Sequence, residues 1–315
     1  MIQYMPSKPS QTPSSLPVTS KRQIKFLKGM RIVSLALNLP GPAALMRCQA
    51  MGASCIKIEP PTPTGATPGI SGDPMSSYNP QAYTQLHLGV RVLTADLKSD
   101  KGQQRLHREL SKADLLLTSF RPSALRKLGL DWKSLHKTHP QLSQVAIVGA
   151  PGAGAEEPGH DLTYLAQTDL LTGLNLPATL YADMAGSLMA SEAMLLALMQ
   201  RGGKAVFMEV ALADAASYLA LPRAWGLSAT GAPVGGGHAG YKLYACKDGR
   251  VALAALEPHF AARLCKVAGL ERPHVNTMFE ASTHQAIAKW LLQKTCEMLN
   301  ALAIEHDIPL QTLPK

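Results

Sequence analysis

Aromatic side chains are scarce in this chain, at 5% of its 315 residues. No run of apolar residues approaches the roughly 18 that a membrane-spanning helix needs, so we expect a soluble protein with no membrane partner. The hydrophobic fraction of 46% is that of an ordinary globular protein. A chain of this length can hold two domains or one large one.

Acidic residues are missing from the first 29 residues. These contain five Lys or Arg residues, which supply +5 of the formal net charge of +9. The remaining charge is spread along the chain without a basic run or interleaved aromatics, so nucleic-acid binding is not indicated. Residues 1–28 are rich in Ser, Pro and Thr and lack the apolar core of a secretory signal, which predicts a disordered leader.

Paired cysteine motifs are also absent. The five cysteines are odd in number and show no CxxC spacing. Most lie in apolar stretches, where a reduced buried thiol is usual, so we expect a cytoplasmic protein. No group of His, Cys and carboxylate residues has metal-ligand spacing, and no metal is predicted. GxGxxG is missing as well, which leaves a nicotinamide cofactor unsupported.

Short apolar runs alternate with helical patterns along the first two thirds of the chain. This spacing predicts βαβ units, and therefore a parallel sheet in an α/β domain. Residues 60–82, rich in Pro, Gly, Ser and Thr, are expected to form a long loop. The six runs of strand length are residues 31–37, 54–59, 91–97, 113–120, 143–148 and 205–212.

The composition changes near residue 228. Ser228–Gly240 is small and Gly-rich, which indicates a hinge or flexible loop. Residues 241–256 are predicted to form a hairpin with Asp248-Gly249 at its turn, followed by helices at 259–268 and about 284–302. We therefore expect three parts: a leader (1–28), a large α/β domain (29–227) and a smaller α+β domain (228–315).

A histidine and a carboxylate are expected at two neighbouring helix starts. His160 opens a predicted helix at 161–174, and Asp183 opens another at 184–201. Helix starts suit an anionic intermediate, and a His/Asp pair there is suited to general acid and base chemistry. Capping alone also explains both residues, because Asp is a common N-cap and His160 fits a loop position after Pro-Gly.

Cations lie at or near the carboxyl ends of predicted strands, namely Lys57, Lys98 and Arg121. Ligands of open α/β sheets bind at this edge, so the three cations suggest a polyphosphate or another anionic ligand. Solvated surface charges are the alternative explanation. Glu257 follows the predicted hairpin and precedes Pro258, where an exposed carboxylate can face the first domain.

Six stretches, taken together and in order, resemble the family III CoA-transferases (CaiB/BaiF-like), and the closest motifs are those of α-methylacyl-CoA racemases. The resemblance runs from about Gly29 to Pro309. The stretches are GMRIVSLALNLPGPAALMRCQAMGASCIKIEPP, VRVLTADLKSDKG, SFRPSALRKLGLDW, PGHDLTYLAQTDLLTG, YADMAGS and DGRVALAALEPHF.

The resemblance implies a Rossmann-like large domain, a small α+β domain, and a homodimer of two chains threaded through each other as interlocked rings. It also implies acyl-CoA thioester substrates, with coenzyme A as part of the substrate and no tightly bound cofactor. CoA-binding positions carried over by the resemblance are Lys57, Arg91, Ala95, Leu97, Lys98, Arg121 and Tyr164.

The resemblance also gives roles to His160, Asp183 and Glu257. Asp183 matches the aspartate that is acylated in the transferases. In the racemases this aspartate pairs with a histidine, here His160, across the substrate's α-carbon, and Glu257 matches the glutamate that orients the histidine. A racemase acting by α-proton transfer is favoured, because acid–base work needs an oriented partner and a nucleophile alone does not. The alternatives are a CoA transferase with an aspartyl intermediate and a non-catalytic acyl-CoA binder.

The sequence departs from the family at four places, one of which is the short loop between His160 and Asp183, which lacks the usual Pro-rich insert. His87-Leu88-Gly89-Val90 stands where the family has Asn-Arg-Gly-Lys, so one CoA-facing lysine is missing. YADMAGS is bulkier at its start than the family's GDFGG-like turn. After HDIPLQTLPK, relatives continue with a segment that returns to the large domain, and its absence is expected to weaken ring closure. These departures motivate the third alternative.

Overall fold

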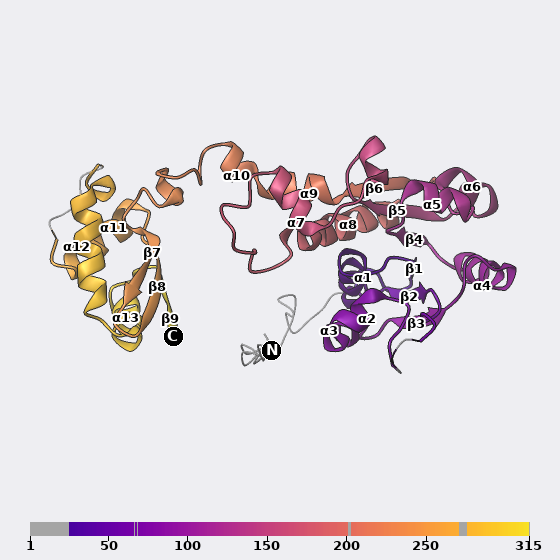
Figure 1. Cartoon of the computed structure of the whole chain (residues 1–315), viewed down its shortest axis with the longest axis horizontal. Helices are drawn as coiled ribbons and strands as arrows, with labels where there is room; N and C mark the ends of the chain where they lie inside the picture. Colours follow the sequence, from indigo (N-terminus) through magenta and orange to yellow (C-terminus); the bar gives the residue numbers. More distant parts are fainter. Residues whose placement is uncertain (1–24, 66, 68, 201–202, 271–275, 315) are drawn as a thin grey trace. The chain divides into compact units, whose positions relative to one another are not determined.

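The computed structural model describes residues 25–314 apart from residues 66, 68, 201–202 and 271–275. Most of the predicted leader, residues 1–24, lies outside the described residues. The chain divides into two compact units, the first ending at Leu219 and the second beginning at Ala220 (Figure 1).

The first unit is built on a six-stranded sheet in which all neighbouring strands are parallel. Each of the six predicted runs contributes a strand, which confirms the α/β prediction. The strand order is β3-β2-β1-β4-β5-β6, the Rossmann order, and it has a topological switch point between β1 and β4. The strands are β1 (Arg31–Ser34), β2 (Ser54–Glu59), β3 (Arg91–Thr94), β4 (Leu115–Thr118), β5 (Ser143–Val148) and β6 (Phe207–Ala211).

Helices cover both faces of this sheet, because alternate strand residues point to opposite sides. Ile32 and Leu115 enter one core, while their neighbours Val33 and Leu116 enter the other. The helices of the first core are α1 (Pro40–Ala50), α7 (Asp161–Gln167), α8 (Tyr181–Met199) and α9 (Leu212–Leu219). Those of the second core are α4 (Asp100–Leu110), α5 (Pro122–Lys127) and α6 (Trp132–Thr138).

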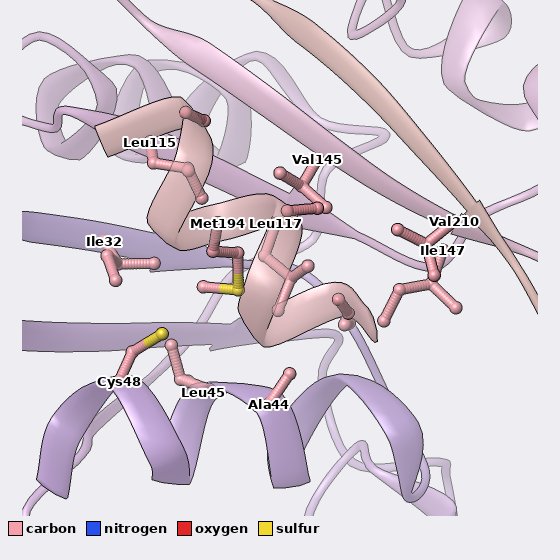
Figure 2. Packing of buried hydrophobic residues seen from close by; sticks show 14 of the residues in the cluster. Ile32, Ala44, Leu45, Cys48, Leu115, Leu117, Val145, Ile147, Met194 and Val210 are labelled. Carbon is pink, nitrogen blue, oxygen red and sulfur yellow. The ribbon is translucent and has the colours of Figure 1, made fainter. Parts of the chain in front are cut away.

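Helix α8 is central to the first core. Its Met194 has no exposed surface, and Figure 2 shows this side chain among Leu45 and Cys48 of α1 and Ile32 and Leu117 of the sheet. Among the described residues, α8 is also the one helix with the length and apolar composition of a membrane span, and half of that window is buried. Because a core helix passes the same test, the composition is weak evidence for a membrane.

The long loop predicted over residues 60–82 is partly helical, which corrects the prediction. It contains α2 (Pro74–Tyr78) and the start of α3 (Pro80–Leu86). Each helix has proline in its first turn and a side-chain cap: Asp73 accepts from the Met75 N–H, and Asn79 accepts from the Ala82 N–H. Proline and Asn or Asp indicate loops in a sequence, but they are equally the residues that begin helices.

Two other predicted helices are shorter or divided. The helix expected at 161–174 ends at Gln167, and Asp169 just beyond it has a φ of 56°, in the left-handed region that terminates helices. The sequence pattern after the sixth strand predicts one helix over residues 214–225, but the structure divides this segment into α9 and α10 (Leu221–Ala224). Pro222 lies at the start of α10, where its ring cannot continue a preceding helix.

The second unit contains the predicted hairpin, with β7 (Tyr241–Cys246) antiparallel to β8 (Gly249–Ala254). A third strand, β9 (Leu310–Pro314), pairs with β8 and was not predicted from the sequence. The helix expected at about 284–302 is two helices, because Thr295 caps a new start. The helices are α11 (Pro258–Val267), α12 (Ala281–Leu292) and α13 (Cys296–Glu305).

Lys57 of β2 is a fully buried cation in a polar network. Its ammonium donates to Asp73 and lies 3.0 Å from Glu59 Oε1 and 2.9 Å from His87 Nε2. His87 Nδ1 lies 2.6 Å from the Tyr83 carbonyl oxygen, so Nδ1–H donates there and Nε2 accepts from the ammonium. Burial, and then the charge of Lys57, lower the pKa of His87, in keeping with a neutral ring. The network joins α2 and α3 to the end of β2.

Replacement of Lys57 by methionine is expected to lower the free energy of unfolding by about 3–5 kcal/mol, because two buried carboxylates lose their cation. Urea unfolding of the whole chain measures this change. Lys101→Met, an exposed position on α4, is the matched control and should stay within about 0.5 kcal/mol of the parent. Equal stability of the two variants would show that the network does not stabilise the fold.

Candidate active site

A cavity of about 270 Å³ opens where three neighbouring strands of the first unit end. Asn38 follows β1, Ser119 and Arg121 follow β4, and Gly149 follows β5, and all four residues line the cavity. This edge is next to the switch point between β1 and β4, where open α/β sheets bind their ligands.

His160 and Asp183 both line this cavity, as the prediction of a shared site requires. His160 precedes α7, and its backbone is fixed there by Thr163. The His160 N–H donates to Thr163 Oγ1 at 3.1 Å, and the Thr163 hydroxyl donates to the His160 carbonyl at 2.8 Å. This arrangement holds the backbone while the His160 side chain is exposed at the cavity.

Asp183 lies inside the first turn of α8, so its predicted place as the helix N-cap is wrong. The helix begins at Tyr181 and the cap position is Leu180. The Asp183 N–H donates to Oδ1 of Asp161, the buried first residue of α7, at 3.0 Å. One carboxylate therefore joins the two helix starts. The position of Asp161 next to His160 points to it in the sequence. The sequence does not show which N–H donates to the Asp161 carboxylate.

The environment of Asp183 changes its ionisation. Burial, and then the neighbouring Asp161 carboxylate, raise the pKa of Asp183 to about 6, while His160 opposes the rise. A carboxyl group with this pKa can give or take a proton near neutral pH at small cost in free energy, which is the requirement for general acid and base catalysis.

Tyr164 of α7 is buried under the loop that carries His160. A Cβ atom at Gly149 or Gly159 would come within 2.4 Å of the Tyr164 hydroxyl oxygen, so both loops need glycine to pass over it. Burial, and then Asp183, raise the pKa of Tyr164, and Arg121 opposes the rise. The phenol therefore lies within electrostatic range of the carboxyl group and the guanidinium on the cavity wall.

The other predicted CoA contacts divide into two groups. Lys98 and Leu97 line a second cavity, of about 580 Å³, together with Lys127, which the sequence analysis did not single out. Ala95 is buried beneath the end of β3. The three predicted positions Ala95, Leu97 and Lys98 follow the carboxyl end of β3, and Arg121 follows that of β4.

Two of the positions that the resemblance assigned to CoA binding lie elsewhere, and for Lys57 this corrects its predicted place on the strand-end rim. The Lys57 ammonium is buried in its network and has no exposed surface for a phosphate. Arg91 begins β3, so it lies at the amino edge of the sheet, where its guanidinium is 3.1 Å from Glu109. The resemblance assigned Arg91 to CoA binding but did not indicate at which edge of the sheet this residue lies. Glu257 occupies the N-cap position of α11 in the second unit without a side-chain capping hydrogen bond, and its role stays a prediction.

Comparison with known proteins agrees with this arrangement. The model of CoA-transferase family III matches residues 27–314. Human alpha-methylacyl-CoA racemase is 30% identical over 265 residues, which cover 78% of this chain and 65% of that protein. Cinnamoyl-CoA:phenyllactate CoA-transferase of Clostridium sporogenes is 35% identical over 142 residues, covering 44% of this chain and 34% of that protein. The matches thus span between about a third and two thirds of these relatives.

Solved structures show the same fold. A hypothetical protein from Mycobacterium tuberculosis superimposes with a TM-score of 0.76 at 22% identity, covering 90% of this chain and 83% of that one. A CAIB/BAIF family protein from Brucella suis gives a TM-score of 0.71 at 23% identity, covering 92% and 84%. Together with the match along nearly the whole sequence, these findings show that the chain belongs to CoA-transferase family III, as its motifs predicted.

Proposed function

We propose that this chain is an acyl-CoA enzyme that inverts the stereocentre of a 2-methylacyl-CoA by α-proton transfer. The observation that carries the proposal is that His160 and Asp183 line one cavity, with the pKa of Asp183 raised to about 6. Inversion needs a base on one face of the α-carbon and an acid on the other. The role of Glu257 in orienting His160 belongs to this proposal and rests on the family resemblance.

In this reaction, one of the two groups removes the α-proton and the other returns a proton to the opposite face. The intermediate is an enolate, whose negative charge favours the positive end of α8. The Asp183 N–H already donates to Asp161, so the nearby helix contributes through its dipole and through the N–H groups that precede Asp183. Asp161 fixes the helix start against which the enolate forms.

Binding of coenzyme A is supported by the cations beside the two cavities. Arg121 lines the cavity that holds the acid–base pair, and Lys98 and Lys127 line the second one. Guanidinium and ammonium groups are the usual partners of phosphates. Contacts with the nucleotide, remote from the α-carbon, would supply the orientation that proton transfer requires.

A CoA transferase is the second candidate, favoured by the partial exposure of Asp183 to the cavity. As a nucleophile, its carboxylate would attack the thioester carbonyl and expel the CoA thiolate, giving a mixed anhydride. The thiolate would then attack the aspartyl carbonyl of the anhydride and release the first carboxylic acid, leaving an aspartyl-CoA thioester. The relatives include a CoA-transferase and a racemase. The transferase chemistry requires Asp183 and leaves His160 without an obligatory role.

Deuterium exchange distinguishes these reactions. In D₂O, the chain should incorporate deuterium into one enantiomer of a 2-methylacyl-CoA and racemise it without an acceptor acid. His160→Ala and Asp183→Asn should each reduce the rate at least about 100-fold, because each removes one proton carrier. Mass spectrometry of the product and chiral analysis measure both effects.

His136→Ala, at an exposed position of α6, is the matched control and should keep the parent rate. Transfer of CoA to a free carboxylic acid that survives His160→Ala but not Asp183→Asn would replace the racemase by the transferase. Tight acyl-CoA binding without either reaction would support the non-catalytic binder.

The raised pKa of Asp183 also predicts a stability change with pH. The folded state favours the protonated carboxyl, so its contribution is fully present below the ordinary value of 3.8 and is lost as pH rises through about 6. At pH 8 the free energy of unfolding of Asp183→Asn should therefore be about 1–3 kcal/mol larger than that of the parent. At pH 4 the two free energies of unfolding should be similar. Denaturant unfolding at both pH values tests this. Asp214→Asn, exposed on α9, should show no such pH-dependent gain.

We also propose that the chain forms a homodimer. Helix α8 has an exposed face opposite its core face on which five apolar side chains form one stripe, interrupted by the exposed Glu192 between Leu188 and Leu196. Exposed apolar stripes of this kind mark association surfaces. The residues are Tyr181, Met184, Leu188, Leu196 and Met199.

Substitution of Leu188 and Leu196 by lysine is expected to give monomers, because two charges would be buried in the association surface. Light scattering of the purified chain measures the mass. Ile304→Lys, at an exposed apolar position outside the stripe, should leave the dimer intact. A parent chain that is already monomeric at high concentration would contradict the proposal.

A cytoplasmic location is part of the same proposal. All five cysteines are buried and free. Free thiols persist in reducing compartments, whereas oxidising ones favour disulfides.

A further inference from the structure

Three potential metal ligands from distant parts of the sequence meet in the second unit. Cys246 ends β7, Asp248 lies in the hairpin turn, and Cys296 begins α13. The two Sγ atoms are 3.7 Å apart, and Cys246 Sγ is 3.9 Å from Asp248 Oδ1. The sequence shows no ligand spacing because 48 residues separate Asp248 from Cys296.

Backbone contacts hold this cluster in place. Asp248 Oδ1 accepts the Cys296 N–H at 2.8 Å, and the Lys247 N–H donates to the Lys294 carbonyl at 2.9 Å. Gly249 packs so closely that a Cβ atom there would lie 3.0 Å from Cys296 Sγ. The hairpin turn and the start of α13 are thus joined on both sides of the thiols, so the three ligand atoms are positioned before any ligand arrives.

The distances match tetrahedral coordination. Two Zn–S bonds of about 2.3 Å at the tetrahedral angle place the sulfur atoms about 3.8 Å apart, close to the 3.7 Å between Cys246 and Cys296. A zinc–carboxylate bond of about 2.0–2.2 Å needs only a small shift of the exposed Asp248 side chain. We propose that Cys246, Asp248 and Cys296 bind a thiophilic divalent cation such as Zn²⁺, with water in the fourth position.

The local charge is compatible with such a cation. Two thiolates and one carboxylate around a divalent cation leave a net charge of −1, which the positive end of α13 stabilises. Desolvation, and then the neighbouring Asp248 and Cys246, raise the pKa of Cys296 to about 11. The Cys296 thiol is therefore protonated without the cation, and cation binding releases this proton to solvent.

A second group of potential metal ligands differs from this one, because a lysine side chain already lies among its members. Glu59, Asp73 and His87 also lie within 4.8 Å of one another. The Lys57 ammonium contacts all three, so the position that a cation would take among them is already filled by a positive group. Among the described residues, the cluster at Cys246 has soft ligands and contacts no such ammonium, which makes it the better cation site.

Zinc titration of the reduced, chelator-treated full chain tests the proposal. We expect one Zn²⁺ per chain at micromolar or tighter affinity by calorimetry, and an ultraviolet thiolate-to-metal charge-transfer band with Cd²⁺. The Cys246→Ser/Cys296→Ser double variant should bind at least about 100-fold more weakly and lose the band, since hydroxyls are poor zinc ligands.

Two further variants separate ligation from folding. Asp248→Asn keeps an oxygen acceptor for the Cys296 N–H but removes the anionic ligand, and should weaken binding about tenfold. Cys265→Ser, in the same core but beside Met278, should leave stoichiometry and affinity unchanged. Circular dichroism of each variant without metal confirms that the unit is folded.

Three outcomes would overturn the proposal. These are no Zn²⁺ uptake by the reduced chain, equal uptake by the double serine variant, or uptake that follows Cys265 instead. A reduced chain that ignores Zn²⁺ but forms a Cys246–Cys296 disulfide with oxidised glutathione would show that the pair is a redox couple. None of these measurements depends on acyl-CoA chemistry, so the proposed reaction is tested independently.

Discussion

A single hydrogen bond joins the parts of the site in the first unit. The buried Asp161 carboxylate, at the start of α7, accepts the Asp183 N–H at the start of α8. It fixes the relation between two helices that are separated in sequence by an irregular segment. The same negative charge contributes to the raised pKa of Asp183. The Asp161 carboxylate thus contributes both to the geometry of the site and, after burial, to the ionisation of Asp183.

The strands of the first unit were predictable because each is a short apolar run set between helical patterns. Six ordered motifs added the family, and His160 and Asp183 were found by their place at helix starts. The contact made by Asp161 was not predictable, since a carboxylate next to a helix start can cap its own helix or reach another one. The packing of α7 against α8 determines which N–H donates to the Asp161 carboxylate.

Local signals failed where tertiary contacts determine the structure. Asp73 follows a Pro- and Gly-rich stretch that indicates a loop, yet it caps α2 and also accepts the buried Lys57 ammonium. His87, which replaces a family asparagine, completes the same network. Lys57, which the resemblance assigned to CoA binding, is therefore an interior charge, and one of the residues that contact it, His87, departs from the family pattern. Strand β9 was missed because its apolar content is low and its partner lies some sixty positions earlier in the chain.

The phenol of Tyr164 packs between two loops, one that contains Gly149 and one that contains Gly159. Gly149 and Gly159 both cross its hydroxyl with no room for a methyl group. The two glycines differ in what they contact: a Cβ at Gly149 meets mainly the hydroxyl oxygen, whereas a Cβ at Gly159 would also lie 2.7 Å from two carbons of the ring. Loss of the oxygen at position 164 therefore makes room for a methyl group at position 149 but not at position 159. Covariation of alanine at position 149 with phenylalanine at position 164, with glycine kept at position 159, is the pattern that this contact would leave in evolution.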